Sequence, residues 1–151
     1  APAVVASRQA YARGLARAHV ALGRRLASLG PAGGSPVLAM SDCGAAPYYS
    51  GWSTVDLYGL NDPAVARTGR HDAGAVLRRH PDVVVLVSQR AGTFVPFPWN
   101  LHEVALLDSC VRGGMTRVKT LGFDPRWYFL WVLARPGSEV ARGLAAWQVD
   151  P

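Results

Sequence analysis

Several side chains that could take part in chemistry lie in one stretch, residues 37–67. Its three aspartates, Asp42, Asp56 and Asp62, could act as a general acid and base or supply oxygen ligands to a hard cation. Their spacing matches no known metal-binding loop. Asp42 and Asp62 fit turn caps better, and Asp56 interrupts an apolar run, where an unpaired carboxylate is too costly. The carboxylates alone therefore indicate neither a catalytic pair nor a metal site.

Three aromatic side chains in the same stretch gather around a turn that contains glycine and proline: Tyr48, Tyr49 and Trp52. Aromatic faces stack on sugar rings, and the polar tips of tyrosine and tryptophan form hydrogen bonds. The group could therefore contact a glycan. Packing of the turn against the core is the simpler alternative.

A small basic cluster follows, with Arg67, Arg70 and His71 close together. Arginine and histidine together can hold a phosphate group. The cluster has only one histidine and no Gly-rich cradle, so this signal is weak. We keep Asn61, Asp62, Arg67 and His71 as candidate ligand-binding residues beside Asp42 and the three aromatic residues.

A later loop, residues 89–99, alternates aromatic residues with prolines. Phe94, Phe97 and Trp99 are side chains of the kind found at membrane interfaces and protein contacts. Ordinary packing beneath a rigid proline loop is the alternative.

The cysteines and the absence of familiar signatures bear on catalysis. Cys43 and Cys110 are either two buried free thiols or a disulfide, which would need an oxidising compartment. Residues 51–55 lack the second glycine of G-x-S-x-G, and the chain contains no G-x-G-x-x-G, Walker loop, H-E-x-x-H or C-x-x-C. The sequence thus gives no reason to expect a cofactor or a metal, and it does not favour an enzyme acting alone.

The elements that must position these residues predict one α/β domain over residues 1–151. Residues 4–29 lack proline and repeat apolar residues at steps of three and four, which predicts a leading amphipathic helix within 1–30. Apolar runs and turn residues predict the remaining elements, within 36–147. These are strands at 36–41, 54–57 and 83–87, helices at 73–79, 100–112 and 138–146, and an antiparallel hairpin of 115–121 with 127–133 joined by a loop at 122–125.

Polar residues at the helix starts predict caps. Asp72 and Ser138 precede two of the helices, and Asn100 with Glu103 resembles a capping box. The predicted fold is a mixed β-sheet covered by helices, with the hairpin at its C-terminal end. In open α/β sheets, ligands bind beyond the carboxyl ends of the strands. Asp42, Asn61 with Asp62, and residues 88–90 follow such ends, so we expect the site at that edge.

The amino-acid composition indicates which classes of binding partner to expect. Charged residues make up 17% of the chain, below the roughly 25% typical of soluble domains, so part of the surface is expected to be covered in a larger molecule. The net charge of +6 comes almost wholly from arginine. The sequence has no nucleic-acid-binding signature, and nucleic acid is not an expected partner. The longest apolar run, residues 127–134, is too short to span a membrane.

These segments resemble the C-terminal extracytoplasmic domain of bacterial GT-C type membrane glycosyltransferases, in the arabinofuranosyltransferase and mannosyltransferase-like group. The resemblance rests on Asp-x-Gly-Ala-x-Pro-Tyr-Tyr-Ser at 42–50 and Asp-Leu-x-Gly-Leu-x-Asp at 56–62, which occur in order. Residues 22–26, 69–71 and 79–86 also fit.

The resemblance implies an accessory domain rather than a catalytic one. Enzymes of this type use polyprenyl-phosphate sugars, and their catalytic carboxylate lies in the membrane region, so no catalytic residue carries over. The implied partners are the transmembrane region of the same polypeptide and a cell-envelope glycan or polyprenyl-phosphate sugar, on the extracytoplasmic face of the membrane. Two alternatives stay open: a self-standing hydrolase or transferase that uses Asp42, Cys43 and His71, and a domain that only braces the membrane helices.

Overall fold

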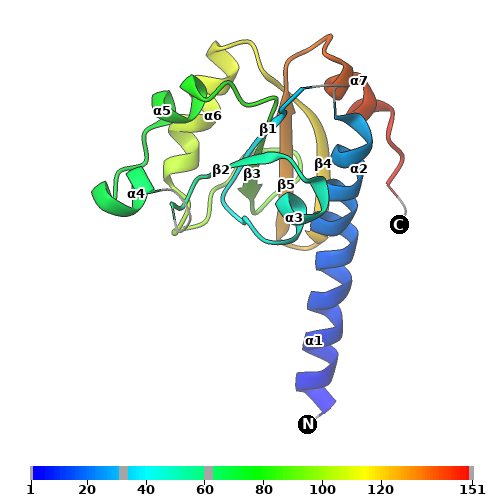
Figure 1. Cartoon of the computed structure of the whole chain (residues 1–151). Coiled ribbons are helices and arrows are strands. Elements are labelled where there is room, and N and C mark those ends of the chain that lie inside the picture. The colour runs from blue at the N-terminus through cyan, green and yellow to red at the C-terminus, as the bar shows by residue number, and fades with distance from the viewer. Residues whose placement is uncertain (1, 31–33, 60–62, 150–151) are drawn as a thin grey trace.

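The fold is built on one five-stranded mixed sheet, as predicted. A computed structural model describes residues 2–30, 34–59 and 63–149 (Figure 1). The strand order is β2-β1-β3-β5-β4. β2, β1 and β3 are parallel to one another, whereas β5 pairs antiparallel with both of its neighbours, β3 and β4. The strands are β1 (Val37–Met40), β2 (Ser53–Asp56), β3 (Val83–Ser88), β4 (Thr116–Asp124) and β5 (Tyr128–Ala134).

Helices cover both faces of this sheet. On one face, α2 (Ala21–Leu29), α3 (Ala45–Ser50) and α7 (Glu139–Ala146) cover a core that includes Leu22, Met40 and Val85. On the other face, α5 (Ala73–Arg78) and α6 (His102–Arg112) cover a core that includes Val84 and Leu106. The central strand β3 is buried along its whole length. Its five consecutive apolar residues predict this burial, since a strand covered on both faces reads as a continuous apolar run.

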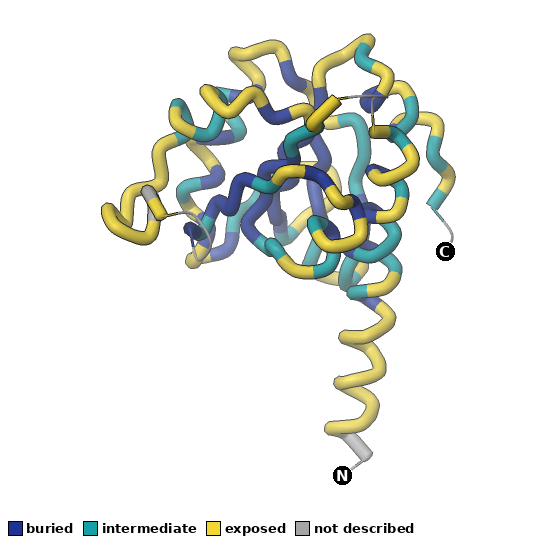
Figure 2. The backbone as a smooth tube through the Cα atoms, viewed as in Figure 1, coloured by how far each residue is buried: buried dark blue, intermediate teal, exposed yellow. Residues whose placement is uncertain are grey.

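The N-terminal helix extends beyond the body of the domain. It comprises α1 (Pro2–Leu15), a π-helical segment (Ala16–Val20) and α2, and the joining residues Leu15, Val20 and Ala21 keep helical dihedral angles. Residues 4–13 are exposed, and burial begins at Gly14 (Figure 2). The predicted amphipathic helix therefore forms, but only its second half packs on the sheet.

The local predictions have mixed outcomes. Asp72 and Ser138 do cap helices, because their side chains accept hydrogen bonds from Gly74 N at 2.8 Å and Ala141 N at 3.0 Å. The capping box at Asn100 is wrong. The side-chain oxygen of Asn100 accepts from Phe97 N, and α6 starts after Leu101 without a side-chain cap.

Two connections also differ from the prediction. Residues 45–50 form the short helix α3 rather than a turn. The hairpin turn lies at residues 125–127, because β4 continues to Asp124 with an irregularity between Gly122 and Asp124. The short α4 (Pro63–Thr68) completes the fold. Within 2–30, 34–59 and 63–149, no helix has the length and hydropathy needed to cross a bilayer.

Candidate functional site

Asp42 lies where the sequence places it, just beyond the carboxyl end of β1. Its Oδ2 is 3.0 Å from Nε2 of His19, which comes from the π-helical segment. The His19 side chain is 1% exposed and that of Asp42 is 46% exposed. Single π-helical turns are rare and often occur at functional sites. Here the segment supplies the buried imidazole that contacts an accessible carboxylate.

The surroundings of Asp42 keep it ionised. Its interaction with His19 lowers the pKa of Asp42 most, and a hydrogen bond from the Tyr128 hydroxyl lowers it further, against the effect of burial. Burial and the nearby charges of Asp42 and Glu103 raise the pKa of Tyr128 above its usual value, so this hydroxyl remains a donor. The result is an oriented carboxylate with one side open to solvent.

Tyr128 belongs to a group of aromatic rings in mutual contact, which we call the edge cluster. Its members are Tyr11, Phe97, Trp99, Phe123, Trp127 and Tyr128. The rings are in continuous contact: Tyr11 meets Phe123 at 5.3 Å, Phe123 meets Tyr128 at 4.9 Å, and Phe97 stacks on Trp99 at 4.5 Å. Tyr11, Trp99 and Trp127 are 60%, 57% and 47% exposed, so the cluster has an open aromatic surface.

Glu103 anchors this edge from within. It is fully buried, and it accepts hydrogen bonds from Ser41 Oγ, from Val87 N at 2.7 Å and from Asn100 Nδ2 at 2.8 Å. Burial raises the pKa of Glu103 to about 7, although these hydrogen bonds favour the charged form. Glu103 thereby ties the start of α6 to the ends of β1 and β3.

The predicted glycan-binding aromatics do not form one surface. Tyr48 and Tyr49 are exposed on α3, with ring centroids 5.2 Å apart, and the Arg24 guanidinium lies 5.2 Å from the Tyr49 ring. Trp52 is only 7% exposed and belongs to the core beneath α2 and α3. Burial in this core leaves little of the Trp52 ring for the ligand contact expected of it.

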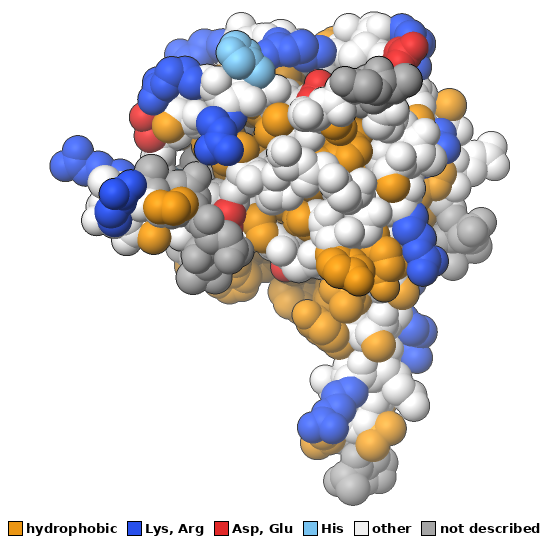
Figure 3. All heavy atoms as spheres, viewed as in Figure 1, with side chains coloured by type: hydrophobic (Ala, Val, Ile, Leu, Met, Phe, Trp, Pro, Cys, Tyr) orange, Lys and Arg blue, Asp and Glu red, His pale blue; other side chains and the backbone are white. Residues whose placement is uncertain are grey.

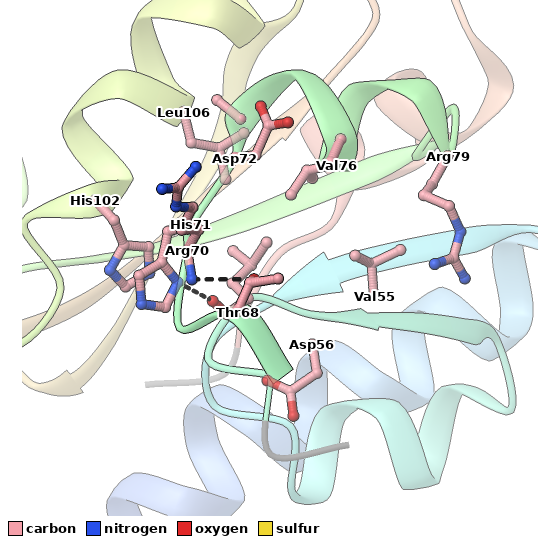
Figure 4. Close-up of a pocket in the computed structure, with 13 residues that line it drawn as sticks. Val55, Asp56, Thr68, Arg70, His71, Asp72, Val76, Arg79, His102 and Leu106 are labelled. Atoms are coloured by element: carbon pink, nitrogen blue, oxygen red, sulfur yellow. Dashed lines mark hydrogen bonds between the residues drawn. The ribbon is translucent and has the colours of Figure 1, made fainter. Parts of the chain in front are cut away.

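The predicted basic cluster stays together only in part, because Arg70 and His71 line one pocket and Arg67 does not. Arg67 is exposed, and its Nε donates to Pro63 O at 2.9 Å within α4. His71 lies at a pocket, where its Nδ1 donates to Leu57 O at 2.9 Å and its ring stacks on His102 at 3.9 Å (Figure 4). Asn61 and Asp62 lie outside the described residues.

The aromatic proline loop is only partly available for contacts. Phe97 is 4% exposed and packs in the core, and Phe94 is half-buried with its ring 5.4 Å from that of Trp131. Burial leaves Phe97 little surface for a contact, whereas the contact role expected of Phe94 stays a prediction. Trp99 alone of the three presents a largely open ring.

Both cysteines are free thiols, so the disulfide considered for Cys43 and Cys110 does not form. Cys43 packs against one core of the sheet and Cys110 lies in the other. Burial and the charge of Asp56 raise the pKa of Cys43 to about 12, and its thiol donates to Met40 O at 3.0 Å. A protonated thiol is a poor nucleophile. Asp42 contacts His19 and His71 Nδ1 donates to Leu57 O, so these contacts do not join Asp42, Cys43 and His71 into a triad.

Sequence reasoning did not single out five contributors to the edge: Tyr11, His19, Phe123, Trp127 and Tyr128. His19 falls within an ordinary helical pattern, and nothing in that pattern marks the π-helical segment. Trp127 and Tyr128 begin the predicted strand 127–133, and nothing in its apolar pattern marks either residue as part of a site. In the described part of the chain, no group of three His, Cys, Asp or Glu side chains converges in a way that could hold a metal ion.

Comparison with known proteins gives one match. A family model described as "Domain of unknown function (DUF8728)" matches residues 6–136. This range contains all five strands and every residue of the edge described above. No curated protein and no solved structure matches the chain.

Proposed function

The chain belongs to the DUF8728 family, a domain of unknown function, and we propose that it is a non-catalytic accessory domain of a membrane glycosyltransferase. The parent enzyme would transfer sugars from polyprenyl phosphate on the extracytoplasmic side. The domain would contact the transmembrane region of the same polypeptide and hold a glycan at the edge cluster. The sequence resemblance suggests the class of enzyme, and the geometry suggests which surfaces take part.

The observation that carries the proposal is that α1 and the edge cluster lie at the same end of the molecule. α1 projects from the body there, and hydrophobic side chains gather where it leaves (Figures 1 and 3). Val4 and Val5 of the projecting part are 55% and 53% exposed. Because a helix gains most of its stability from packing, an unpacked one with exposed apolar residues suits a contact with another part of a larger protein.

The open face of the edge cluster has the chemistry of a glycan site. Trp99 and Trp127 offer aromatic faces for stacking on sugar rings. The ionised Asp42 can accept hydrogen bonds from sugar hydroxyl groups, and bonds to a charged acceptor are stronger than neutral ones. Its contacts with His19 and Tyr128 hold the carboxylate in place, which lowers the entropic cost of binding.

Glycan binding can be tested with the 151-residue chain. Arabinofuranose and mannose oligosaccharides would be titrated while tryptophan fluorescence and the indole NMR signals are recorded. We expect Trp99→Ala and Asp42→Asn each to weaken binding by about tenfold, the value of one stacked ring or one charged hydrogen bond. Thermal melting would confirm that both variants are folded.

Tyr48→Ala is the matched control, since it removes an exposed ring on α3. Weaker binding by Tyr48→Ala with unchanged binding by Trp99→Ala would move the site to α3. Absence of binding to every oligosaccharide would contradict the glycan role and favour a domain that only braces the membrane helices. The membrane context has its own test, because the proposal expects several hydrophobic spans encoded upstream of residue 1. A reading frame that starts near residue 1 would contradict it.

A further inference from the structure

A second site lies on the other face of the sheet. A pocket of about 410 Å³ opens between α5, α6 and the end of β2 (Figure 4). Its apolar walls include Val55, Leu57, Val76 and Leu106, all of which belong to the core on that face or pack against it. Pockets that bind small molecules have volumes of roughly 300 to 1,000 Å³ and mostly apolar walls with a few polar groups.

The charged groups that line this pocket are two carboxylates, Asp56 and Asp72, and two guanidiniums, Arg70 and Arg79, and both carboxylates already have partners. The Asp56 carboxylate accepts hydrogen bonds from Tyr58 N at 2.9 Å and Gly59 N at 3.1 Å. The Asp72 carboxylate accepts from Gly74 N and pairs with Arg78 at 3.3 Å. Arg70 lines the pocket, and its guanidinium has no carboxylate partner among the residues that the structure describes.

Beyond the lining, the surrounding surface is rich in basic side chains. Besides Arg70, the segment of α4 and α5 carries Arg67, Arg78 and Arg79, and Figure 3 shows basic side chains gathered over these helices. Clustered charges of one sign beside an apolar wall raise the local concentration of an oppositely charged ligand.

Two stacked imidazoles form one end of the pocket. The rings of His71 and His102 are 3.9 Å apart and nearly parallel. Burial and the charge of His71 lower the pKa of His102 to about 4, so this ring is neutral near pH 7. Its Nε2 is buried and has no hydrogen-bond partner in the described part of the chain. A buried polar atom without a partner is costly, and a bound ligand could satisfy it.

We propose that this pocket binds a small organic anion, with its apolar body against Val55, Val76 and Leu106 and its anionic end between Arg70 and the stacked imidazoles of His71 and His102. Phosphate monoesters and carboxylates share this chemistry. An apolar wall alone would accept any neutral hydrocarbon, whereas the Arg70 guanidinium, which has no carboxylate partner among the described residues, selects for a negative end. This site is independent of the edge cluster and of the proposed function.

The test uses hexyl phosphate and hexanoate as probes, with 1-hexanol and inorganic phosphate as controls, in calorimetric titrations of the 151-residue chain near neutral pH. The two anionic probes distinguish a phosphate ester from a carboxylate. We expect at least one of them to bind with one site per chain. The neutral alcohol and free phosphate should bind at least about tenfold more weakly, since the alcohol lacks the anionic end and phosphate lacks the apolar body.

Substitutions inside and outside the pocket test whether the probes bind there. Arg70→Gln should weaken the anionic probe by about fivefold or more, while Arg67→Gln, which removes the same charge from a residue outside the pocket, should change it by less than about twofold. Val76→Trp should fill the pocket and abolish binding. The imidazole NMR signals of His71 and His102 should shift on titration.

Three results would overturn the proposal. Equal affinity for 1-hexanol and the anions would leave an apolar cavity with no anion site. Equal loss in Arg70→Gln and Arg67→Gln would show a diffuse effect of charge. Binding that leaves the imidazole signals unmoved would place the ligand elsewhere. If Val76→Trp does not fold, the paired arginine variants and the NMR signals still decide the question.

Discussion

At the residue scale, two carboxyl groups near one edge of the sheet have opposite environments. Asp42 is partly exposed and receives polar contacts from His19 and Tyr128, which keep its pKa low. Glu103 is fully buried, and desolvation raises its pKa to about 7 despite three hydrogen-bond donors. Asp42 therefore suits ligand contact, and Glu103 suits the internal anchoring of α6 to the sheet.

The raised pKa of Glu103 predicts a pH-dependent stability. The folded state holds this proton up to about pH 7, whereas the unfolded chain loses it near its ordinary value of 4.5. The free energy of unfolding should thus receive its full contribution from Glu103 below about pH 4.5 and lose it, in total about 3 kcal/mol, as the pH rises through 7. Urea denaturation of wild type and Glu103→Gln across this range would measure the difference.

Glu139 provides the matched control for this prediction, since it is an exposed glutamate in the first turn of α7. Glu139→Gln should keep the wild-type dependence on pH, and Glu103→Gln should flatten it. A slope that is the same in all three proteins would mean that Glu103 titrates at an ordinary pKa in the fold.

Individual residues also show where sequence reasoning reaches its limit. Asp42 could be placed at the edge because a polar residue after a buried strand obeys a general rule of α/β sheets. Trp52 could not be assigned, since its burial depends on α2 packing over α3, which no local pattern records. The contact between His19 and Asp42 joins distant segments through a π-helical segment that has no sequence signature.

At the scale of elements, the close approach of α2 to α3 fixes the helix layer above the edge. A Cβ atom built on Gly23 would lie 2.6 Å from Ala46 O and 2.8 Å from the Tyr49 Cβ. Such distances leave no room for a methyl group unless the two helices separate. Gly23 is therefore required for packing, although glycine weakens a helix interior by roughly 0.5 to 1 kcal/mol relative to alanine.

Gly23→Ala should consequently destabilise the domain even though alanine favours helix. Overpacking typically costs about 1 to 3 kcal/mol, which exceeds the gain in helix propensity. Thermal and chemical denaturation would measure this loss, with Gly92→Ala as the control, because no atom lies within 4 Å of a Cβ built at Gly92. A Gly23→Ala protein more stable than wild type would show that α2 and α3 are not packed as described.

Elements were predictable where one periodicity extends over many residues. The apolar run of β3 and the regular spacing of apolar residues in the N-terminal helix identify both elements. The short α3 was missed because its proline and the glycines on either side of it, Gly44 and Gly51, are typical of a turn. The capping box at Asn100 failed because Glu103 turns inward to Ser41 and Val87, a choice that depends on the buried strand ends.

At the scale of the whole molecule, the N-terminal helix has an exposed part that projects and a later part that packs in the core. The core begins with Gly14 and Ala18, and the residues before Tyr11 whose side chains are described are exposed. Helices of this length are marginal in water without tertiary packing. The projecting turns therefore contribute little to the stability of the domain, and their apolar side chains are available to a partner.

Removal of residues 1–10 should accordingly leave the free energy of unfolding within about 0.5 kcal/mol of the full chain, the usual range for changes at exposed positions. Leu22→Ala, which truncates a fully buried side chain on the packed half of the same helix, should cost about 2 to 5 kcal/mol. Chemical denaturation would measure both, and amide hydrogen exchange should show protection that falls from α2 toward the N-terminus. A truncation that costs as much as Leu22→Ala would mean that α1 supports this domain itself. The case for a helix that contacts a membrane-embedded partner would then lose its main structural support.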